Sequence, residues 1–431
     1  MQSDRMPVLL NKQHPMKSQV TILIFLFAFS FFVPRSEPAK AVFTDNQGFF
    51  TPVTIVKNLS FGMRNDAEVV KLQQALIERG YMTLGQATGN LFSTTRGAVM
   101  SFQTNHSIPA TGYVGPLTRA ELAKTGEKLY LLGGLANFAG RSNDIWSTPD
   151  GIAWTREALH ANWERRTQFG AALFNNKLFV ISGTAEEGMV NDAWSSSDAI
   201  TWNLENSNLP WCYRADFSVV TLNKIHYVIG GSGGCTLGKN DAGSDVWSST
   251  DGKTWTRILA SAPWGPRSLH STVVFDEKIW ILGGKLVNDE VNDVWSSPDG
   301  IKWTREVEEA PWESRSHHQA IVYKDQIFLV GGSTSNDGEY EYFSDVWSTS
   351  DGSKWTSVTS RASFGGRESF GLSTLNNKLI LIGGVGDNGS GDVGRQSDVW
   401  STSDGKVWTK ITNDAPWEER DTFGLVRTVN P

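Results

Sequence analysis

Apolar residues follow two different periods along the chain. Between residues 58 and 124 they recur every three or four positions, as Val69, Leu72 and Leu76 do, which is typical of helices with one buried face. From residue 127 onward they form short runs such as Ile279–Leu282, bounded by glycine and polar turns, which indicates strands. The pattern therefore predicts a small helical unit followed by a long unit of strands.

The helical stretch predicts three helices. The first begins near Asn65 or Asp66, either of which can cap it, and Gly80 can end it. The second covers about residues 94–105. The third begins at Pro116, a residue suited to a first helical turn, and is expected to carry Leu117 on its buried face.

Several spaced motifs lie inside this unit. Residues 88–99 recur in outline 23 positions later, so the unit contains a half-repeat. Val-x-x-Leu-Gln-x-x-Leu begins at Val69, Ala-Val-x-x-Phe-Gln at Ala98, and Thr-Gly-Tyr-Val-Gly-Pro-x-Thr at Thr111. With these motifs, residues 58–125 resemble the peptidoglycan-binding-like domain. The resemblance implies a three-helix fold that binds the bacterial cell wall, although members of this fold also serve as spacers.

Gln73 and Gln103 lie in these motifs and are candidates for ligand contacts. The alternative is that each glutamine satisfies buried backbone groups. We expect the second role, because buried polar groups are nearly always hydrogen-bonded within a fold.

The strand region repeats one motif: Asp-x-Trp-Ser, then a short turn that is usually Asp-Gly, then tryptophan. The copies lie about 50 residues apart, a period typical of a β-propeller with one four-stranded blade per repeat. In the fourth copy the strands are expected at residues 268–275, 278–282, 292–297 and 302–307. The six copies begin at Asp144, Asp192, Asp245, Asp293, Asp345 and Asp398.

The two ends of the strand region complement each other. The first copy has no first strand ahead of residues 128–132, whereas residues 421–425 match first-strand starts such as residues 368–372. We therefore expect a small all-α three-helix module plus an all-β six-bladed β-propeller over residues 127–431, closed by the C-terminal strand.

Each copy carries two tryptophans, as Trp295 and Trp303 do in the fourth. If Asp299-Gly300 forms a two-residue hairpin turn, Trp303 pairs with Ser296 and points to the face opposite Trp295. Each blade would then present one tryptophan to each neighbour. Packing of this kind needs no cofactor, and none is expected.

Glycine pairs such as Gly283-Gly284 follow the second strand in five copies, and the second copy has Ser182-Gly183. Together with the later tryptophan, these pairs resemble the kelch repeats of galactose-oxidase-like propellers, from Glu127 to the C-terminus. The Ser-x-Asp-Gly-x-x-Trp hairpin also resembles the Asp-box of sialidases, but it is one residue short. Both families form propellers, so the expected fold is the same.

Residues 1–41 have the features of a signal peptide. Lys12 and Lys17 precede the apolar run Val20–Val33, and Ala39-Lys40-Ala41 offers a cleavage site. A membrane span needs about 20 apolar residues, so this run is short for one. An uncleaved anchor is the alternative, and membrane contact is expected only through it. We expect a secreted or cell-envelope associated protein.

The net charge of the mature chain limits the classes of partner that it is expected to bind. Removing residues 1–41 takes away five of the 39 Lys and Arg and two of the 46 Asp and Glu, which leaves a net charge of −10. An acidic exported protein without a basic run is a poor candidate for binding nucleic acid. Two further features concern the N-terminal part of the chain. Met16 is an alternative start that leaves the same mature chain. Residues 42–57 are expected to be a linker.

One face of the expected propeller collects two recurring features. Because strands alternate in direction, the loop that enters each first strand lies on the same face as the glycine-pair loops. Arginine and aromatic side chains there would suit an acidic sugar, since guanidinium binds carboxylate in a fork and rings stack on sugars. The alternative is that each arginine braces the neighbouring blade, and the sixfold recurrence favours this role, because an asymmetric ligand rarely needs six equivalent contacts. The candidates are Trp163 and Arg166, Trp211 and Arg214, Trp264 and Arg267, Trp312 and Arg315, Phe364 and Arg367, and Trp417 and Arg420.

Features that break the repeat are further candidates. His317 and His318 start the first strand of the fifth copy, and His270 is the equivalent of His318 in the fourth. No spaced ligand set accompanies them, so no metal site is expected. Two acidic loops, residues 337–342 and 387–392, could bind calcium but lack a recognised spacing, and we expect them to be solvated.

Cys212 and Cys235 are the two cysteines of the chain. The alternation of strand direction puts their loops on one face of the third blade, and an exported protein folds under oxidising conditions. We expect them to form a disulfide, the alternative being two separate buried thiols.

The sequence favours binding over catalysis. No strand-anchored nucleophilic tyrosine with a glutamate partner stands out, and the copper ligand set of galactose oxidases is not evident, so the catalytic residues of any enzyme reading are unknown. We expect an exported bacterial binding or scaffold protein whose helical module holds peptidoglycan or another cell-wall glycan. The propeller face would present a site for a protein or a sugar. The alternative is a glycan-active propeller enzyme, similar to sialidases or sialate mutarotases.

Overall fold

The computed structural model describes residues 53–78, 81–83, 85–106, 108–122, 127–234, 243–336, 339–387 and 393–428. The predicted signal peptide, residues 1–41, lies outside these described residues, as do Gly80 and most of the predicted linker. Within the described ranges, no helix is long and apolar enough to cross a membrane.

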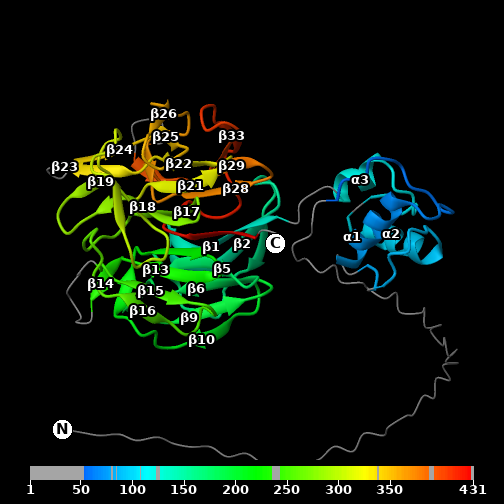
Figure 1. The fold of residues 1–431 in the computed structure, drawn as a ribbon, viewed down its shortest axis with the longest axis horizontal. Coiled ribbons are helices and arrows are strands. Elements are labelled where there is room, and N and C mark those ends of the chain that lie inside the picture. The colour runs from blue at the N-terminus through cyan, green and yellow to red at the C-terminus, as the bar shows by residue number, and fades with distance from the viewer. Residues whose placement is uncertain are drawn as a thin grey trace, which may run out of the picture. The chain divides into compact units, whose positions relative to one another are not determined.

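The helical module contains α1 (Ala67–Glu78), α2 (Ser93–Asn105) and α3 (Pro116–Leu122) (Figure 1). Asp66 caps α1, because its Oδ1 accepts the backbone N–H of Glu68 at 2.9 Å. Leu117, which was expected to be buried, is 67% exposed, since the short helix α3 turns Thr118 and Leu122 inward instead. The core of the module includes Leu59, Val69, Leu72, Leu76, Leu91, Val99, Phe102, Val114 and Leu122.

Gln73 and Gln103 play the same structural role in the two halves of this module. The amide nitrogen of Gln103 donates to the carbonyl of Tyr113 at 2.8 Å, and its amide oxygen accepts the backbone N–H of Gly112 at 2.8 Å. Gln73 makes the equivalent bonds around Gly89. Both glutamines are 1% exposed, so the prediction that they satisfy buried backbone groups is confirmed.

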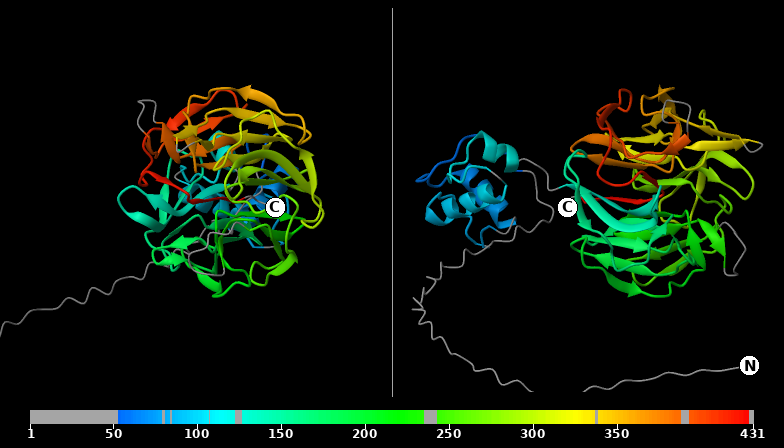
Figure 2. Two further views of the ribbon diagram at one scale, coloured as in Figure 1. Left: turned by 90° about the vertical axis from the view of Figure 1, so that its left-hand side faces the viewer. Right: turned by 180° about the vertical axis from the view of Figure 1, so that it is seen from behind.

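The strand-rich unit, residues 127–428, contains six antiparallel sheets that continue the repeats of the sequence (Figures 1 and 2). The first three sheets consist of β1 (Lys128–Ala136), β2 (Gly140–Thr148), β3 (Thr155–Ala158), β34 (Arg420–Asp421) and β35 (Gly424–Thr428); of β5 (Gly170–Phe174), β6 (Lys177–Ile181), β9 (Ala193–Ser196) and β10 (Asn203–Asn206); and of β12 (Ser218–Leu222), β13 (Ile225–Ile229), β15 (Val246–Ser249) and β16 (Thr256–Leu259).

The last three sheets have the same strand order. They consist of β17 (Ser271–Phe275), β18 (Lys278–Lys285), β19 (Glu290–Ser297) and β20 (Thr304–Val307); of β21 (Gln319–Tyr323), β22 (Gln326–Val330), β25 (Val346–Thr349) and β26 (Thr356–Thr359); and of β28 (Gly371–Leu375), β29 (Lys378–Ile382), β32 (Val399–Thr402) and β33 (Thr409–Thr412).

Short strands form four further small sheets in the loops that enter a first strand and in the loops that join a second strand to a third. They are β4 (Arg166–Thr167), β7 (Thr184–Ala185) and β8 (Gly188–Met189); β11 (Tyr213–Ala215) and β14 (Ser232–Gly234); β23 (Ser333–Asn336) and β24 (Glu339–Tyr342); and β27 (Arg367–Glu368), β30 (Val385–Asp387) and β31 (Val393–Arg395).

The first sheet contains strands from both ends of the strand-rich unit. Strand β35 pairs with β1 from Lys128 opposite Thr428 to Leu132 opposite Gly424, and β34 pairs with the end of β1 at Leu135. In Figure 2 the red C-terminal strand accordingly lies beside the cyan strands of the first sheet. The chain therefore supplies the first strand of its first repeat from its C-terminus.

The Asp-Gly turn between the third and fourth strands is longer than predicted. In the fourth sheet Ser296 pairs with Thr304 and not with Trp303. The Oδ1 of Asp299 accepts the backbone N–H groups of residues 301–302, both at 2.8 Å. The carboxylate thus closes a wider turn than the two-residue hairpin.

The wider turn places both tryptophans of a repeat on the same side of their sheet. Trp295 and Trp303 pack in one cluster with Tyr227 and Ile229 of the third sheet. The prediction that each sheet presents one tryptophan to each neighbour is therefore wrong, because it depended on a two-residue turn.

Candidate functional site

Each of the six arginines considered as a ligand contact is bound to an aspartate of its own repeat. For Arg267, Nη1 lies 2.8 Å from Oδ1 of Asp293, and Nη2 lies 3.0 Å from Oδ2. Nη1 also donates to the carbonyl of Gly283 at 3.1 Å, while Oδ2 of Asp293 accepts the indole N–H of Trp295 at 2.7 Å. Arg267 is 1% exposed, so its charge is neutralised within the fold.

The same contacts recur in the other five repeats. Every arginine binds the aspartate of an Asp-x-Trp-Ser motif, and every one of these aspartates accepts the N–H of the tryptophan two positions later. The recurring motif therefore stabilises each sheet. The pairs are Arg166–Asp192, Arg214–Asp245, Arg267–Asp293, Arg315–Asp345, Arg367–Asp398 and Arg420–Asp144.

The aromatic residues that precede these arginines are buried as well. Trp264 meets Trp303 edge to face, with ring centroids 5.9 Å apart. These contacts support the bracing role of the repeated residues. The guanidinium groups brace their own repeat, and the backbone carbonyls of Arg214, Arg267, Arg315, Arg367 and Arg420 each accept the N–H of a glycine in the preceding repeat, at 2.9–3.1 Å. A role in holding an acidic sugar finds no support in these contacts. The buried aromatic residues are Trp163, Trp211, Trp264, Trp312, Phe364 and Trp417.

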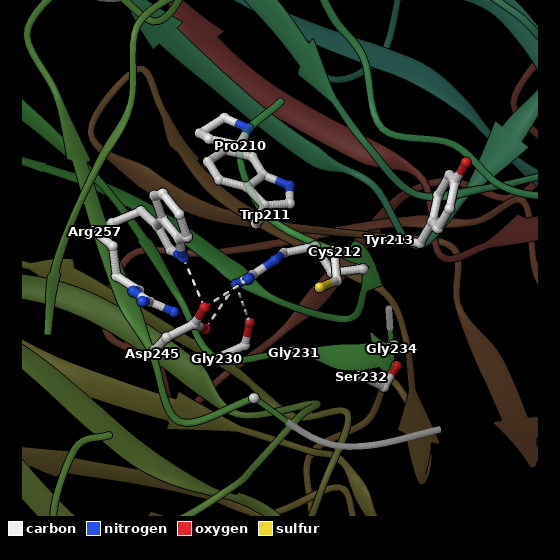
Figure 3. A pocket seen from close by; sticks show the side chains of 14 residues that line it. Pro210, Trp211, Cys212, Tyr213, Gly230, Gly231, Ser232, Gly234, Asp245 and Arg257 are labelled. Carbon is white, nitrogen blue, oxygen red and sulfur yellow. Dashed lines mark hydrogen bonds and ion pairs between the residues drawn. The ribbon is translucent and has the colours of Figure 1, made fainter. Parts of the chain in front are cut away.

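Two hollows adjoin this network. One of about 640 Å³ is lined in part by Trp211, Tyr213 and Asp245 (Figure 3), and another of about 670 Å³ is lined in part by Asp345. In the first, dashed lines in Figure 3 run to the carboxylate of Asp245, which Arg214 holds at 2.9 and 3.1 Å, and to the carbonyl of Gly230, which accepts from Arg214 at 3.0 Å. Arg214 and Asp245 thus neutralise each other, while the exposed Arg257, which also lines this hollow, lies over the ring of Trp247.

A closed series of six backbone hydrogen bonds links the starts of the first strands. The N–H of each residue donates to the carbonyl of its equivalent in another sheet, over distances of 3.1–3.2 Å. All six residues have a positive backbone angle φ, between 49° and 58°, which residues other than glycine rarely adopt. We call these residues the inner ring: Gln168, Asp216, Leu269, His317, Ser369 and Thr422.

A cavity of about 150 Å³ lies at the inner ring. The six inner-ring positions carry six different residue types, whereas the position after each of them is always Phe or His. The cavity is therefore lined where the repeats differ, and we take it as the candidate functional site. Besides the inner ring it is lined by Phe169, Phe217, His270, His318, Gln319, Phe370 and Phe423.

Asp216 brings a carboxylate to this cavity. Its Oδ2 accepts hydrogen bonds from the amide nitrogen of Gln168 at 3.1 Å and from the hydroxyl of Ser232 at 3.2 Å. Burial raises the pKa of Asp216 above its ordinary value, and the charge of His317 opposes this shift. The carboxylate is thus held in surroundings that disfavour its charge.

His317 and Glu368 form a second polar group beside the cavity. Nδ1 of His317 lies 3.4 Å from Oε2 of Glu368 and 3.2 Å from the hydroxyl of Ser316. Oε2 of Glu368 also accepts the hydroxyl of Ser333. The carboxyl groups of Glu368 and Asp216 thus lie near the single imidazole of His317.

His270 and His318 fill positions that hold phenylalanine in the other four repeats. Their ring nitrogens form no hydrogen bond of ordinary geometry with the described part of the chain. Burial, together with the nearby Arg267 and Arg315, lowers the pKa of both histidines to about 3, so both are neutral at physiological pH. They act here as aromatic core residues that line the cavity.

The three histidine candidates thus come together at one cavity. Among the described residues, no group of three or more His, Cys, Asp or Glu is arranged to hold a metal ion. Sequence reasoning missed Gln168, Asp216 and Glu368. A signal for the first two was present, because an alignment of the six first-strand starts shows one variable position before each Phe or His.

Cys212 lines the 640 Å³ hollow and is disulfide-bonded. Cys235 lies outside the described residues, so its pairing with Cys212 stays a prediction. Parts of the two acidic loops, residues 337–338 and 388–392, also lie outside them.

The fold and motifs together indicate a wall-binding type of helical module followed by kelch-type repeats. A family model for a peptidoglycan binding domain matches residues 65–122, and a model for the KLHDC2/KLHL20/DRC7 Kelch-repeats domain matches residues 212–384. Both resemblances predicted from the motifs are confirmed, in the predicted order. No curated protein matches the chain.

Proposed function

We propose that this is an exported bacterial protein that binds the cell wall through its helical module, residues 58–125, and a partner through its propeller, residues 127–431. The observation that carries the proposal is the peptidoglycan-binding match over residues 65–122 in a chain that also carries Kelch repeats. Residues 1–41 would direct export, and the mature protein would be secreted or stay in the cell envelope. The chain would thus act as a binding or scaffold protein.

We further propose that the six sheets are the blades of one closed propeller. The first strands contact one another in the cyclic order β35, β5, β12, β17, β21, β28 and back to β35. The inner-ring hydrogen bonds follow the same order. Closure would leave no open sheet edge at the ends of the chain, which protects against aggregation.

Tyr113 and Leu117 are the candidates for wall contact in the helical module. They are 42% and 67% exposed, and they line a cavity of about 190 Å³ with Pro109 and Pro116. An exposed tyrosine beside an apolar recess suits the face of a sugar ring, because aromatic rings combine apolar area with a polar edge.

The half-repeat provides a test that preserves the fold. Asn90 and Thr94 occupy the positions in the first half that Tyr113 and Leu117 occupy in the second. The double variant Tyr113→Asn, Leu117→Thr therefore gives the second half the residues that the first half already accommodates.

The experiment is co-sedimentation of the full-length mature protein with insoluble peptidoglycan. We expect retention of the unaltered protein, a loss of most of that retention in the double variant, and no change in the control Val56→Thr, which alters another exposed apolar residue of the module. If the unaltered protein is not retained above an unrelated protein, the module is a spacer.

A further inference from the structure

The inner-ring cavity has the chemistry of a cation site. We infer that it binds a protonated amine, carried either by a small molecule or by the side chain of a partner. The inference rests on the proposed role of the propeller as a binding unit, and it is independent of the wall-binding role of the helical module. It is carried by charge, by an incompletely bonded carboxylate and by the walls of the cavity.

The charge at the cavity is negative. Asp216 lines the cavity with its carboxyl group. Glu368 does not line the cavity but adds a second carboxyl group 3.4 Å from His317, which does line it and contributes at most one positive charge. The guanidinium groups of Arg267 and Arg315 are each neutralised by an aspartate of their own sheet. A ligand with one positive charge would therefore complete the charge balance, whereas an anion would be repelled.

Asp216 has room for another donor. In the described part of the chain, its hydrogen bonds come from the neutral groups of Gln168 and Ser232 and involve only Oδ2. No Lys or Arg among the described residues forms a salt bridge with it. Asp216 is partly buried, and a carboxylate withdrawn from water is costly to the extent that no charged partner compensates it. An ammonium group, with three N–H donors, can bind Oδ1 and neighbouring acceptors at once.

The walls and size suit an alkylammonium. Four phenylalanines line the cavity, and aromatic rings attract cations as well as the carbon chain that carries them. The volume of about 150 Å³ is below the roughly 300 Å³ at which pockets for drug-sized ligands begin. The cavity would therefore admit the amine end of a ligand and not a chain of sugar rings. The lining phenylalanines are Phe169, Phe217, Phe370 and Phe423.

The backbone supports a functional role for these side chains. Glycine would adopt the positive φ of the inner ring without strain, yet all six positions carry side chains. Asp216 and His317 are thus kept at strained positions where they reach the cavity. Retained strain of this kind clusters at functional sites.

The test uses the full-length mature protein and two amines of different origin. Propylamine represents a free amine, and Nα-acetyl-lysine amide represents a partner side chain, with propanol as the uncharged match for propylamine. Binding is measured by titration calorimetry at fixed ionic strength, with sodium and potassium chloride compared. We expect at least one amine to bind and propanol not to bind, and the stronger amine identifies the source.

Asp216→Asn keeps the shape of the side chain and removes its charge. We expect it to weaken amine binding at least about tenfold, because hydrogen bonds to a charged group are the strong ones. Glu309→Gln removes one charge at an exposed site and should bind as the unaltered protein does. The inference would be overturned if neither amine binds, or if propanol binds as well as propylamine does. It would also be overturned if Asp216→Asn binds the amines as tightly as the unaltered protein, or if sodium or potassium ions alone displace them. Retention of Asp216→Asn on peptidoglycan reports separately on the helical module.

Discussion

Arg420 holds Asp144 across 276 positions of the chain, with Nη1 2.7 Å from Oδ1 and Nη2 3.0 Å from Oδ2. The pair lies in the one sheet that contains strands from both ends of the strand-rich unit. Burial raises the pKa of Asp144, but the hydrogen bonds and the charge of Arg420 outweigh this effect and hold that pKa below its ordinary value. The two residues therefore depend on each other in the folded state.

Arg420→Met should destabilise the strand-rich unit by about 3–5 kcal/mol, because it leaves the carboxylate of Asp144 buried without its partner. Denaturant unfolding followed by tryptophan fluorescence measures the loss. The control is Arg361→Met, an exposed arginine, which should change the free energy of unfolding by less than about 0.5 kcal/mol. Equal effects of the two substitutions would show that the pair does not stabilise the fold.

The hairpin aspartates predict a loss of stability in acid. The backbone N–H groups of Lys354 and Ser353 lower the pKa of Asp351 from 3.8 to about 2. Since the folded pKa is the lower one, this stabilisation is complete above pH 3.8 and is lost as the pH falls toward 2. Asp351→Asn should flatten this part of the stability curve, measured by urea unfolding at several pH values. Asp276→Asn, at an exposed turn, should leave the curve unchanged.

Asp216 predicts the opposite dependence on pH. Because burial raises its pKa in the folded state, the folded protein holds the proton to a higher pH than the unfolded chain does. Its contribution is most favourable below pH 3.8 and is lost as the pH rises through the raised pKa. His317 is the charged group that faces it, and Gln168 and Ser232 are the neutral ones.

Asp216→Asn should therefore melt at a higher temperature than the unaltered protein at pH 7, and the two melting curves should converge in acid. Calorimetric scans at several pH values check this. A lower melting temperature for the variant at pH 7 would mean that the carboxylate stabilises the fold, and would remove the reason to regard it as kept for binding.

The C-terminal strand is predicted to be necessary for cooperative unfolding. Deleting residues 421–431 removes β35 and exposes the edge of β1, and unpaired edges invite aggregation. The truncated protein should melt over a broader range and aggregate on heating. A shorter truncation after Thr428 keeps all the paired residues and should behave as the full chain does. If the longer truncation melts like the shorter one, β35 does not hold the strand-rich unit together.

The sequence predicted the order and type of the elements well, because both periods are long and repeated. Residues 278–282 and 292–297 fall within observed strands, and the helices begin within a few residues of their predicted starts. The predicted direction of the tryptophan side chains was wrong. That direction depends on the length of a single turn, which is set by the hydrogen bonds that Asp299 accepts from the backbone and not by the Asp-Gly pair alone.

The site was harder to predict for a physical reason. Arg267 and Asp293 are 26 positions apart, and nothing in the spacing shows that they neutralise each other. Without that pairing, a repeated arginine looks like a binding residue. Asp216 gives no motif of its own, and its position at the cavity follows only once the first strands are brought together.

The two cysteines give the last prediction. Cys212 is disulfide-bonded, and we expect Cys235 to be its partner, which closes a loop of 24 residues. A loop of this size stabilises the folded state by on the order of 3 kcal/mol through its effect on the unfolded chain. Alkylation of the unreduced, exported protein followed by mass spectrometry should find no free thiol, and two after reduction. The variant Cys212→Ser, Cys235→Ser should lose a similar free energy of unfolding and become insensitive to reductant. Two alkylatable thiols in the unreduced protein would exclude the bond.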